Sequence, residues 1–340
     1  MIKKCNIKLI IKIIVFILIG LIIFALLSSI LVPDFISADG SRVAIRGFYN
    51  EPKDSLDAVF VGNSSVYKSI SPIELWKDYG MTTYDYSSPE QRIWLSYYLV
   101  KECLNYQTPR VIFLNVDEAF TEDDATEQSI RKALDNMKYK GAKEQAINDK
   151  IFNLSNFDKL SYFIPILRYH SRWDSLSGDD LILDTDEYYT IHKGYIMSKK
   201  QKAYIKGKDN TASVSIGPKV STYLEKIIDL CNERNVELVL MYLPSPMTWS
   251  QNKHKAILDF ANTHDTRFVD MNQNDLLNID WNEDTEDGGW HLNLYGAKKV
   301  THYLGKILTE DYNLPDHRED EDYFYWFEDE DRYNVALYEL

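Results

Sequence analysis

Cysteine is nearly missing from this sequence. Three of its 340 residues are cysteine: Cys5, Cys103 and Cys231. A small extracellular scaffold that depends on disulfides needs many more, so that class of protein is excluded. Cys103 and Cys231 each lie in an apolar, helix-like run, where a thiol behaves as a small apolar side chain. Whether these two cysteines pair stays open.

Positive charge is also scarce. The chain has 38 Lys and Arg against 52 Asp and Glu, a formal net charge of -14. Four lysines near the start account for +4, which leaves about -18 for the remainder. Nucleic acids bind clustered Lys and Arg, so we expect no nucleic-acid partner. His170 and His192 lack the spacing of metal ligands, and we expect no metal and no other cofactor.

Long apolar runs are limited to one, residues 13–32, which carries no charge. Twenty helical residues span ~30 Å, the thickness of a bilayer core. Lys3, Lys4, Lys8 and Lys12 precede the run and Asp34 follows it. The positive-inside rule therefore predicts a cytoplasmic tail over 1–12 and a single-pass cell-membrane anchor, with the rest of the chain outside. A cleaved signal peptide is the competing interpretation, but no Ala-x-Ala site follows the run.

Beyond a predicted linker over 33–53, short apolar segments alternate with amphipathic ones. We expect five strands, at Asp57–Val61, Thr82–Tyr86, Arg110–Val116, Glu237–Leu243 and Arg267–Asp270. We expect the main helices at Pro89–Asn105, Lys219–Asn235, Lys253–Thr263 and Leu294–Thr309. This alternation predicts an α/β three-layer sandwich with a mostly parallel five-stranded sheet. Its ligand site should lie beyond the carboxyl ends of the strands.

Three further segments have their own patterns. Ser71, Pro72 and Glu74 predict a helix start, with Ser71 as N-cap and Glu74 closing a capping box. Residues 121–215 are polar, aromatic and helical, and we interpret them as a mainly helical insertion. Residues 315–340 are acidic and aromatic, which fits either a docked helix or a flexible arm.

The candidate chemistry begins at Gly62-Asn63-Ser64-Ser65, directly after the first predicted strand. A serine hydroxyl becomes a nucleophile only with a base in hydrogen-bond reach. The competing interpretation is a strand-ending turn whose serines cap backbone groups. Far downstream, His291 stands four residues after Asp287, and Asn293 is placed to cap the helix that follows. Such a loop can supply the base and the carboxylate of a Ser-His-Asp relay.

Together the two segments resemble the SGNH, or GDSL-type, hydrolase superfamily, whose fold is flavodoxin-like. Its first block is Gly-Asp-Ser after strand one, and its last is Asp-x-x-His before the final helix. Ser64 matches the nucleophile and His291 the base, while Asn63 replaces the usual Asp. The acid departs from the pattern, because Asp287 lies one residue farther from His291 than the family's Asp does. Asp284 is the alternative acid.

The resemblance also implies donors for an oxyanion: backbone N–H groups at the nucleophile and at a second-block Gly, and the side chain of a third-block Asn. Ser87 or Ser88 stands where that Gly is expected, and Gln91 offers another amide nearby. Asn115, at the end of the third predicted strand, matches the third block. A purely structural role for each amide is the competing interpretation.

Within the superfamily, residues 54–314 resemble the membrane-anchored extracytoplasmic branch, which includes the teichoic acid D-alanyl transfer protein and alginate acetyltransferase-like proteins. This implies a serine esterase or O-acyltransferase acting on acyl esters of a cell-surface polysaccharide or its acyl donor. It also implies a partner membrane O-acyltransferase. The alternative is a catalytically inactive module that binds glycan or serves as a scaffold. The shifted Asp287, Asn63 and the missing second-block Gly favour that alternative.

Two segments are candidates for substrate contact. Arg172 offers a fork for a carboxylate or phosphate, and Tyr169 and Trp173 offer faces for a sugar. A folded cap in which these residues pair and pack internally is the competing interpretation. Residues 242–249 follow the fourth predicted strand and should lie on the same rim as Ser64.

Overall fold

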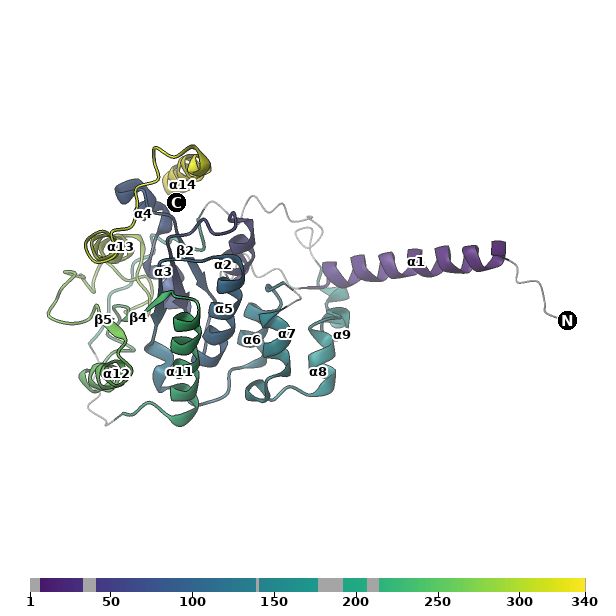
Figure 1. The fold of residues 1–340 in the computed structure, drawn as a ribbon, viewed down its shortest axis with the longest axis horizontal. Coiled ribbons are helices and arrows are strands. Elements are labelled where there is room, and N and C mark those ends of the chain that lie inside the picture. Colours follow the sequence, from purple (N-terminus) through teal and green to yellow (C-terminus); the bar gives the residue numbers. More distant parts are fainter. Residues whose placement is uncertain (1–6, 33–40, 139–140, 177–191, 207–213, 340) are drawn as a thin grey trace. The chain divides into compact units, whose positions relative to one another are not determined.

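The computed structural model describes residues 7–32, 41–138, 141–176, 192–206 and 214–339. Part of the predicted cytoplasmic tail, with Cys5, and parts of the predicted linker and insertion lie outside these ranges. The chain forms two compact units. The first comprises Met1–Asp34 and Asn153–Asp184, and the second comprises Phe35–Phe152 and Thr185–Leu340. Figure 1 shows the elements of both.

The second unit is built on a five-stranded sheet. Its strands are β1 (Ala58–Gly62), β2 (Thr83–Ser87), β3 (Val111–Asn115), β4 (Glu237–Tyr242) and β5 (Arg267–Asp270). Their order is β2-β1-β3-β4-β5, and every neighbouring pair is parallel. The predicted α/β fold is therefore confirmed. Because β1 and β3 are parallel neighbours, the residues that follow them lie close together at the carboxyl ends of the strands.

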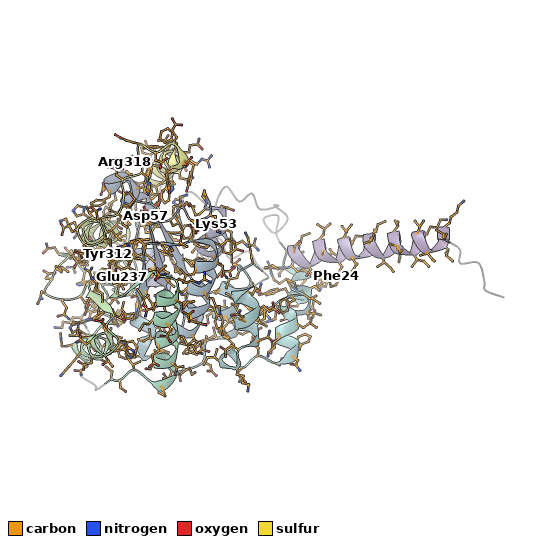
Figure 2. The ribbon with its side chains drawn as sticks, viewed as in Figure 1. Phe24, Lys53, Asp57, Glu237, Tyr312 and Arg318 are labelled. Atoms are coloured by element: carbon orange, nitrogen blue, oxygen red, sulfur yellow. The ribbon has the colours of Figure 1, made fainter. Side chains whose placement is uncertain are left out.

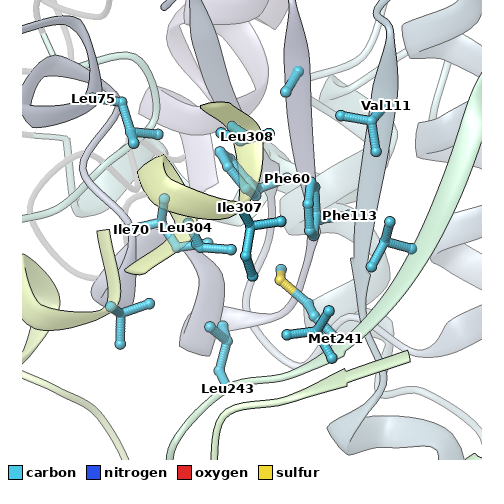
Figure 3. Close-up of a cluster of buried hydrophobic side chains, with 14 of the residues drawn as sticks. Phe60, Ile70, Leu75, Val111, Phe113, Met241, Leu243, Leu304, Ile307 and Leu308 are labelled. Carbon is cyan, nitrogen blue, oxygen red and sulfur yellow. The ribbon is translucent and has the colours of Figure 1, made fainter. Parts of the chain in front are cut away.

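Helices cover both faces of the sheet. On one face lie α3 (Ser64–Ser69), α4 (Pro72–Tyr79) and α13 (Leu294–Glu310). α5 (Ile93–Tyr106) and α11 (Pro218–Glu233) cover the other, and α12 (Gln251–Thr263) packs beside β5. Burial of apolar side chains between α13 and the sheet is the main stabilising term here. Figure 3 shows this core, which includes Phe60, Ile70, Leu75, Phe113, Met241, Leu304 and Leu308.

Polar contacts close the ends of these layers. Tyr312, just beyond α13, donates to Glu237 at the start of β4 over 2.8 Å (Figure 2). At α4, Ser71 caps the helix as predicted by accepting from the Glu74 N–H. The predicted capping box is wrong, however, because the Ser71 N–H donates to Thr301 Oγ1 at 2.9 Å. α13 supplies that hydroxyl, and the Glu74 carboxylate accepts from Tyr333 instead.

The predicted linker is wrong for residues 41–50. They form α2 (Ser41–Gly47) and a 3-10 turn, η1 (Phe48–Asn50). Ala44, Ile45 and Phe48 are buried, and the Phe48 ring stacks on Tyr86 of β2 at 4.2 Å. These apolar side chains join the fold because they cover β2, which lies at the edge of the sheet.

The described part of the predicted insertion is mainly helical and is divided between the units. α6 (Glu127–Leu134) and α7 (Ala142–Asn148) pack in the second unit, with η2 (Asp117–Phe120) and η3 (Lys150–Phe152) flanking them in sequence. The first unit contains α8 (Asn156–Ser161), α9 (Ile166–Tyr169) and η4 (His170–Asp174).

The first unit also contains α1 (Ile7–Ile30). Among the described residues, it is the one helix long and apolar enough to cross a membrane. It begins before the predicted apolar run and includes Lys8 and Lys12. Most of its large apolar side chains are exposed, and Phe24 is labelled among them in Figure 2.

The acidic C-terminal segment is a docked helix, α14 (Tyr325–Glu339), preceded by η6 (Glu321–Tyr323). Trp326 is fully buried and stacks on Trp76 of α4, with ring centroids 5.4 Å apart. Lys193, 1% exposed, lies 4.4 Å from the Trp326 ring and pairs with Asp329 and Glu51 at 2.7 Å each. Both charge and apolar burial therefore hold α14 in place.

We expect Trp326→Ala to lower the free energy of unfolding by ~3–5 kcal/mol, because it leaves a cavity under α14. Tyr338→Ala, which removes a side chain that is 91% exposed, should change it by less than ~0.5 kcal/mol. Urea unfolding of both variants tests this. Equal stabilities would show that α14 is not docked as described.

Acid should weaken the same region through His192. Burial lowers the pKa of His192 to about 4, and the Asp329 carboxylate opposes this only in part. In the unfolded chain the pKa is ~6.5, so the stability from the neutral ring is present above pH ~6.5 and is lost as pH falls towards 4. We expect His192→Gln to lose less stability than wild type between pH 7 and 4.5, by on the order of 2 kcal/mol. Parallel pH dependences of the two proteins would contradict this.

Candidate active site

Ser64 lies at the junction of β1 and α3. A single residue, Asn63, separates the two elements, and its Oδ1 caps α3 by accepting from the Ser65 N–H at 3.0 Å. Ser64 is thus the first residue of a helix, where the competing interpretation expected a turn. Gly62 is required beneath it, because a Cβ there would lie 2.7 Å from Val66 and 2.8 Å from Asn115.

His291 lies in the loop that leads into α13. Asn293 caps α13 as predicted, accepting from the N–H groups of Tyr295 and Gly296. The loop is closed by an isolated bridge between Thr285 and Leu292. It is further held by the Thr285 hydroxyl, which accepts from the Gly289 N–H at 2.7 Å. The backbone of the loop is therefore restrained on both sides of His291.

Two glycines explain the shifted acid. Gly288 and Gly289 have φ values of +89° and +101°, which side-chain-bearing residues rarely adopt. The turn at these two glycines brings Asp287 close to His291, and the His291 N–H donates to Asp287 Oδ1 at 2.9 Å. Asp284, the alternative acid, instead accepts from Lys299 Nζ at 2.6 Å. The structure thus pairs Asp287 with His291, although one residue more separates them than in the family pattern.

The three side chains form a continuous hydrogen-bonded chain. Ser64 Oγ lies 2.8 Å from His291 Nε2, and His291 Nδ1 lies 2.6 Å from Asp287 Oδ2. The side chains of His291 and Asp287 are 26% and 35% exposed, so a substrate can reach them from solvent. A hydroxyl, an imidazole and a carboxylate in this order can activate the hydroxyl as a nucleophile.

Asp287 is suited to orient the imidazole. Burial alone would raise its pKa, but hydrogen bonds from the His291 side chain and from the N–H groups of His291 and Trp290 outweigh burial, so its pKa lies below the usual value. The carboxylate is therefore ionised at neutral pH and accepts a proton held on His291 Nδ1. That tautomer leaves Nε2 as an acceptor for the Ser64 hydroxyl.

An ion pair connects the serine helix to the histidine loop. Lys68 of α3 lies 3.1 and 3.2 Å from the two carboxylate oxygens of Glu286. Glu286, Asp287 and His291 have ligand atoms within 4.8 Å of one another, a grouping that could also hold a metal ion. Each is already engaged: Glu286 with Lys68, Asp287 with His291, and His291 with both Asp287 and Ser64. These contacts account for the grouping without an ion.

Asp117 is a site residue that was not predicted from the sequence. Asn63 Nδ2 donates to both of its carboxylate oxygens at 3.0 Å, and the Ser65 hydroxyl donates to one of them at 3.0 Å. Burial raises the pKa of Asp117, while hydrogen bonds from Asn63, Ser65 and Asn115 oppose that shift without cancelling it. Position 63 is Asn and carries no carboxylate, and the carboxylate that lies against it belongs to Asp117, which follows the neighbouring strand β3. Its position directly after the third predicted strand, Arg110–Val116, was the available signal.

The predicted oxyanion residues lie in this network or beside it. Asn115 Nδ2 donates to Asn63 at 3.3 Å, and its Oδ1 accepts from the Leu243 N–H. Ser88 Oγ donates to Gln91, whose Nε2 donates to the Ser96 hydroxyl at 2.9 Å. All three side chains are buried. Their role as oxyanion donors stays a prediction.

The predicted substrate residues fall in different places. Arg172, Tyr169 and Trp173 all belong to the first unit. Arg172 donates to the Leu31 carbonyl at 2.9 Å, the Tyr169 side chain is buried, and the Trp173 side chain is 72% exposed. Their contact with substrate stays a prediction. Pro246 and Met247, after β4, lie beside the histidine loop, because a Cβ at Gly289 would be 2.8 and 3.4 Å from them.

The contact between Asn63 and Asp117 can be tested by exchanging charge. Asn63→Asp would set two carboxylates face to face, so we expect a loss of roughly 3 kcal/mol of unfolding free energy at pH 8. The loss should shrink as pH falls and one carboxyl becomes protonated. The double variant Asn63→Asp/Asp117→Asn restores one charge and should recover most of the stability. A single variant as stable as wild type at pH 8, in urea unfolding, would contradict the pairing.

No protein-family model matches the chain, and no curated protein is similar to it. Among solved structures, one from Bacteroides fragilis that is named a "putative acylhydrolase" has 12% sequence identity and a TM-score of 0.38. The match covers 82% of this chain and 99% of that one. A likeness at this level carries no argument about function.

Proposed function

We propose that the protein is a membrane-anchored serine esterase or O-acyltransferase of the SGNH type. Its substrate would be the acyl ester of a cell-surface polysaccharide or of the acyl donor for that polymer, outside the membrane. One observation carries the proposal: the hydrogen-bonded chain from Asp287 through His291 to Ser64, with links of 2.6 and 2.8 Å. This chain provides a nucleophile, a general base and the group that orients the base.

In the first half-reaction, His291 Nε2 takes the proton of Ser64 as Oγ forms a bond to the ester carbonyl carbon. The bond to the leaving alkoxide then breaks, and the imidazolium returns the proton to that oxygen. Asp287 stabilises the imidazolium throughout. The oxyanion needs donors, which are worth ~3–4 kcal/mol each in comparable enzymes. The Ser64 N–H is the first we assign, since the first N–H groups of a helix have no acceptor within it.

In the second half-reaction, His291 deprotonates the incoming nucleophile, which attacks the acyl-serine, and Ser64 recovers its proton. Water as nucleophile gives hydrolysis, whereas a sugar hydroxyl gives acyl transfer. The partial exposure of the relay and of Trp290 and Met247, which are 49% and 41% exposed beside it, supports a bulky polymeric substrate. A partner membrane O-acyltransferase would bring the acyl group across the membrane.

The catalytically inactive module is the other function to consider. Three sequence features favoured it, and two of them have a structural explanation that supports catalysis. The shifted acid reaches His291 through Gly288 and Gly289. Asn63, in place of Asp, faces the carboxylate of Asp117. The second-block Ser88 in place of Gly has no such explanation.

A fluorophosphonate probe should label the wild-type protein on Ser64 and should not label Ser64→Ala. Ser65→Ala is the matched control, because its hydroxyl donates to Asp117 and not to His291. It should be labelled. Labelling of the wild type and of both variants is measured by in-gel fluorescence, after circular dichroism has been used to check that each variant is folded. Labelling of Ser64→Ala, or of none of the proteins, would remove the catalytic proposal.

The same assay distinguishes the two candidate acids. Asp287→Asn should slow labelling by about 10³–10⁴-fold, since the amide no longer fixes the productive tautomer of His291. Asp284→Asn removes a carboxylate bonded to Lys299 and should leave the labelling rate of the folded protein near that of wild type. The reverse ranking would assign the role to Asp284.

A further inference from the structure

The first unit carries five exposed large apolar side chains that are close together in sequence, and we call them the apolar patch. Its members are Phe157, Leu160, Phe163, Trp173 and Leu176, with exposed fractions of 57, 48, 38, 72 and 37%. They come from α8, from η4 and from residues next to these elements, within twenty positions of sequence. Water-facing surfaces rarely gather so many large apolar side chains, so the patch indicates a contact surface.

The patch is attached to one end of α1. The Ile166 N–H of α9 donates to Ser28 Oγ at 3.0 Å, and Arg172 of η4 donates to the Leu31 carbonyl at 2.9 Å. Ser28 and Leu31 are buried, while the long apolar side chains of the rest of the helix are exposed. Figure 1 shows α9 beside this C-terminal end of α1, and α8 next to α9.

The length of α1 sets the depth of the patch. We take Lys12 as the inner boundary of the hydrocarbon layer, which is ~30 Å thick. A helix that rises ~1.5 Å per residue then reaches the outer boundary near position 32. Ser28 and Leu31, which hold α9 and η4, lie within about one helical turn of that level. η4, which carries Trp173, is therefore level with the boundary between acyl chains and headgroups, where aromatic side chains such as Trp are enriched.

We propose that residues 157–176 lie on the membrane that α1 crosses, with the apolar patch inserted at this boundary. The occupant of the patch is lipid, because α9 and η4 are bonded to the end of α1 at the interfacial depth. Short amphipathic helices with Phe, Leu and Trp on one face bind membranes in this way. The inference rests on the anchoring part of the proposed function and not on its chemistry. It gives the chain a second membrane contact besides α1.

The test uses the full chain in phosphatidylcholine–phosphatidylglycerol liposomes, with Cys5 replaced by serine. Cys103 and Cys231 are buried and stay in place. Single cysteines at Phe157 or Trp173 carry an environment-sensitive fluorophore. Two controls carry the same label: Phe16→Cys, on α1 and 78% exposed, and Tyr338→Cys, on α14 and 91% exposed. Quenching is measured with lipids brominated near the headgroup and with aqueous iodide.

We expect the labels at 157 and 173 to be quenched several-fold more by the brominated lipid than the label at 338, and to lose most of their iodide quenching. Iodide quenching of 157 and 173 equal to that of 338, while 16 is quenched by lipid, would overturn the proposal. Shielding of 157 and 173 from iodide without lipid quenching would also overturn it, in favour of a protein contact. A label at 16 that lipid does not quench would show that α1 does not cross. That result removes the anchor but leaves the serine chemistry untouched.

Discussion

The carboxylate of Asp117 is the acceptor around which the serine end of the site is organised. It fixes Asn63 through Nδ2, which leaves Asn63 Oδ1 to cap α3. A carboxylate enclosed by protein is tolerated only when donors surround it, and Asn63 and Ser65 provide them. An acid at position 63 would add a second charge where one must already be neutralised. The parallel pairing of β1 with β3 is what brings these residues together.

The fold was predictable because its strands are short, apolar and separated by amphipathic helices, a pattern that few architectures satisfy. Ser64 and His291 could be selected because of their positions in the predicted order of strands and helices. Ser64 follows the first predicted strand, and His291 precedes the last predicted helix. α3 could not be predicted, since six residues carry too little periodicity to indicate a helix. Lys68 and Glu286, 218 positions apart, offer no local signal of their ion pair.

The peripheral segments were harder to predict for a different reason. Residues 41–50 have a mixed composition with two arginines, and α14 combines a few large apolar side chains with six charged ones, so neither segment has the continuous apolar pattern of a buried element. Their placement is decided by what they cover: Tyr86 on the edge strand for Phe48, and Trp76 of α4 for Trp326. Lys193 joins this cover because two carboxylates compensate its buried charge. Such packing depends on both segments of a pair, so it cannot be predicted from the sequence of either segment alone.

The acid and base of the candidate relay are four residues apart on one glycine turn, whereas the serine and histidine are 227 residues apart. Local contacts form early and cheaply during folding, while contacts of long sequence separation must wait for the chain to close. The Asp287–His291 unit can therefore exist before the sheet is complete, but Ser64 cannot meet it until α13 has packed on α3. A newly made chain would carry an inert serine until its last layer is in place. The reactivity of Ser64 would then indicate that the chain has finished folding.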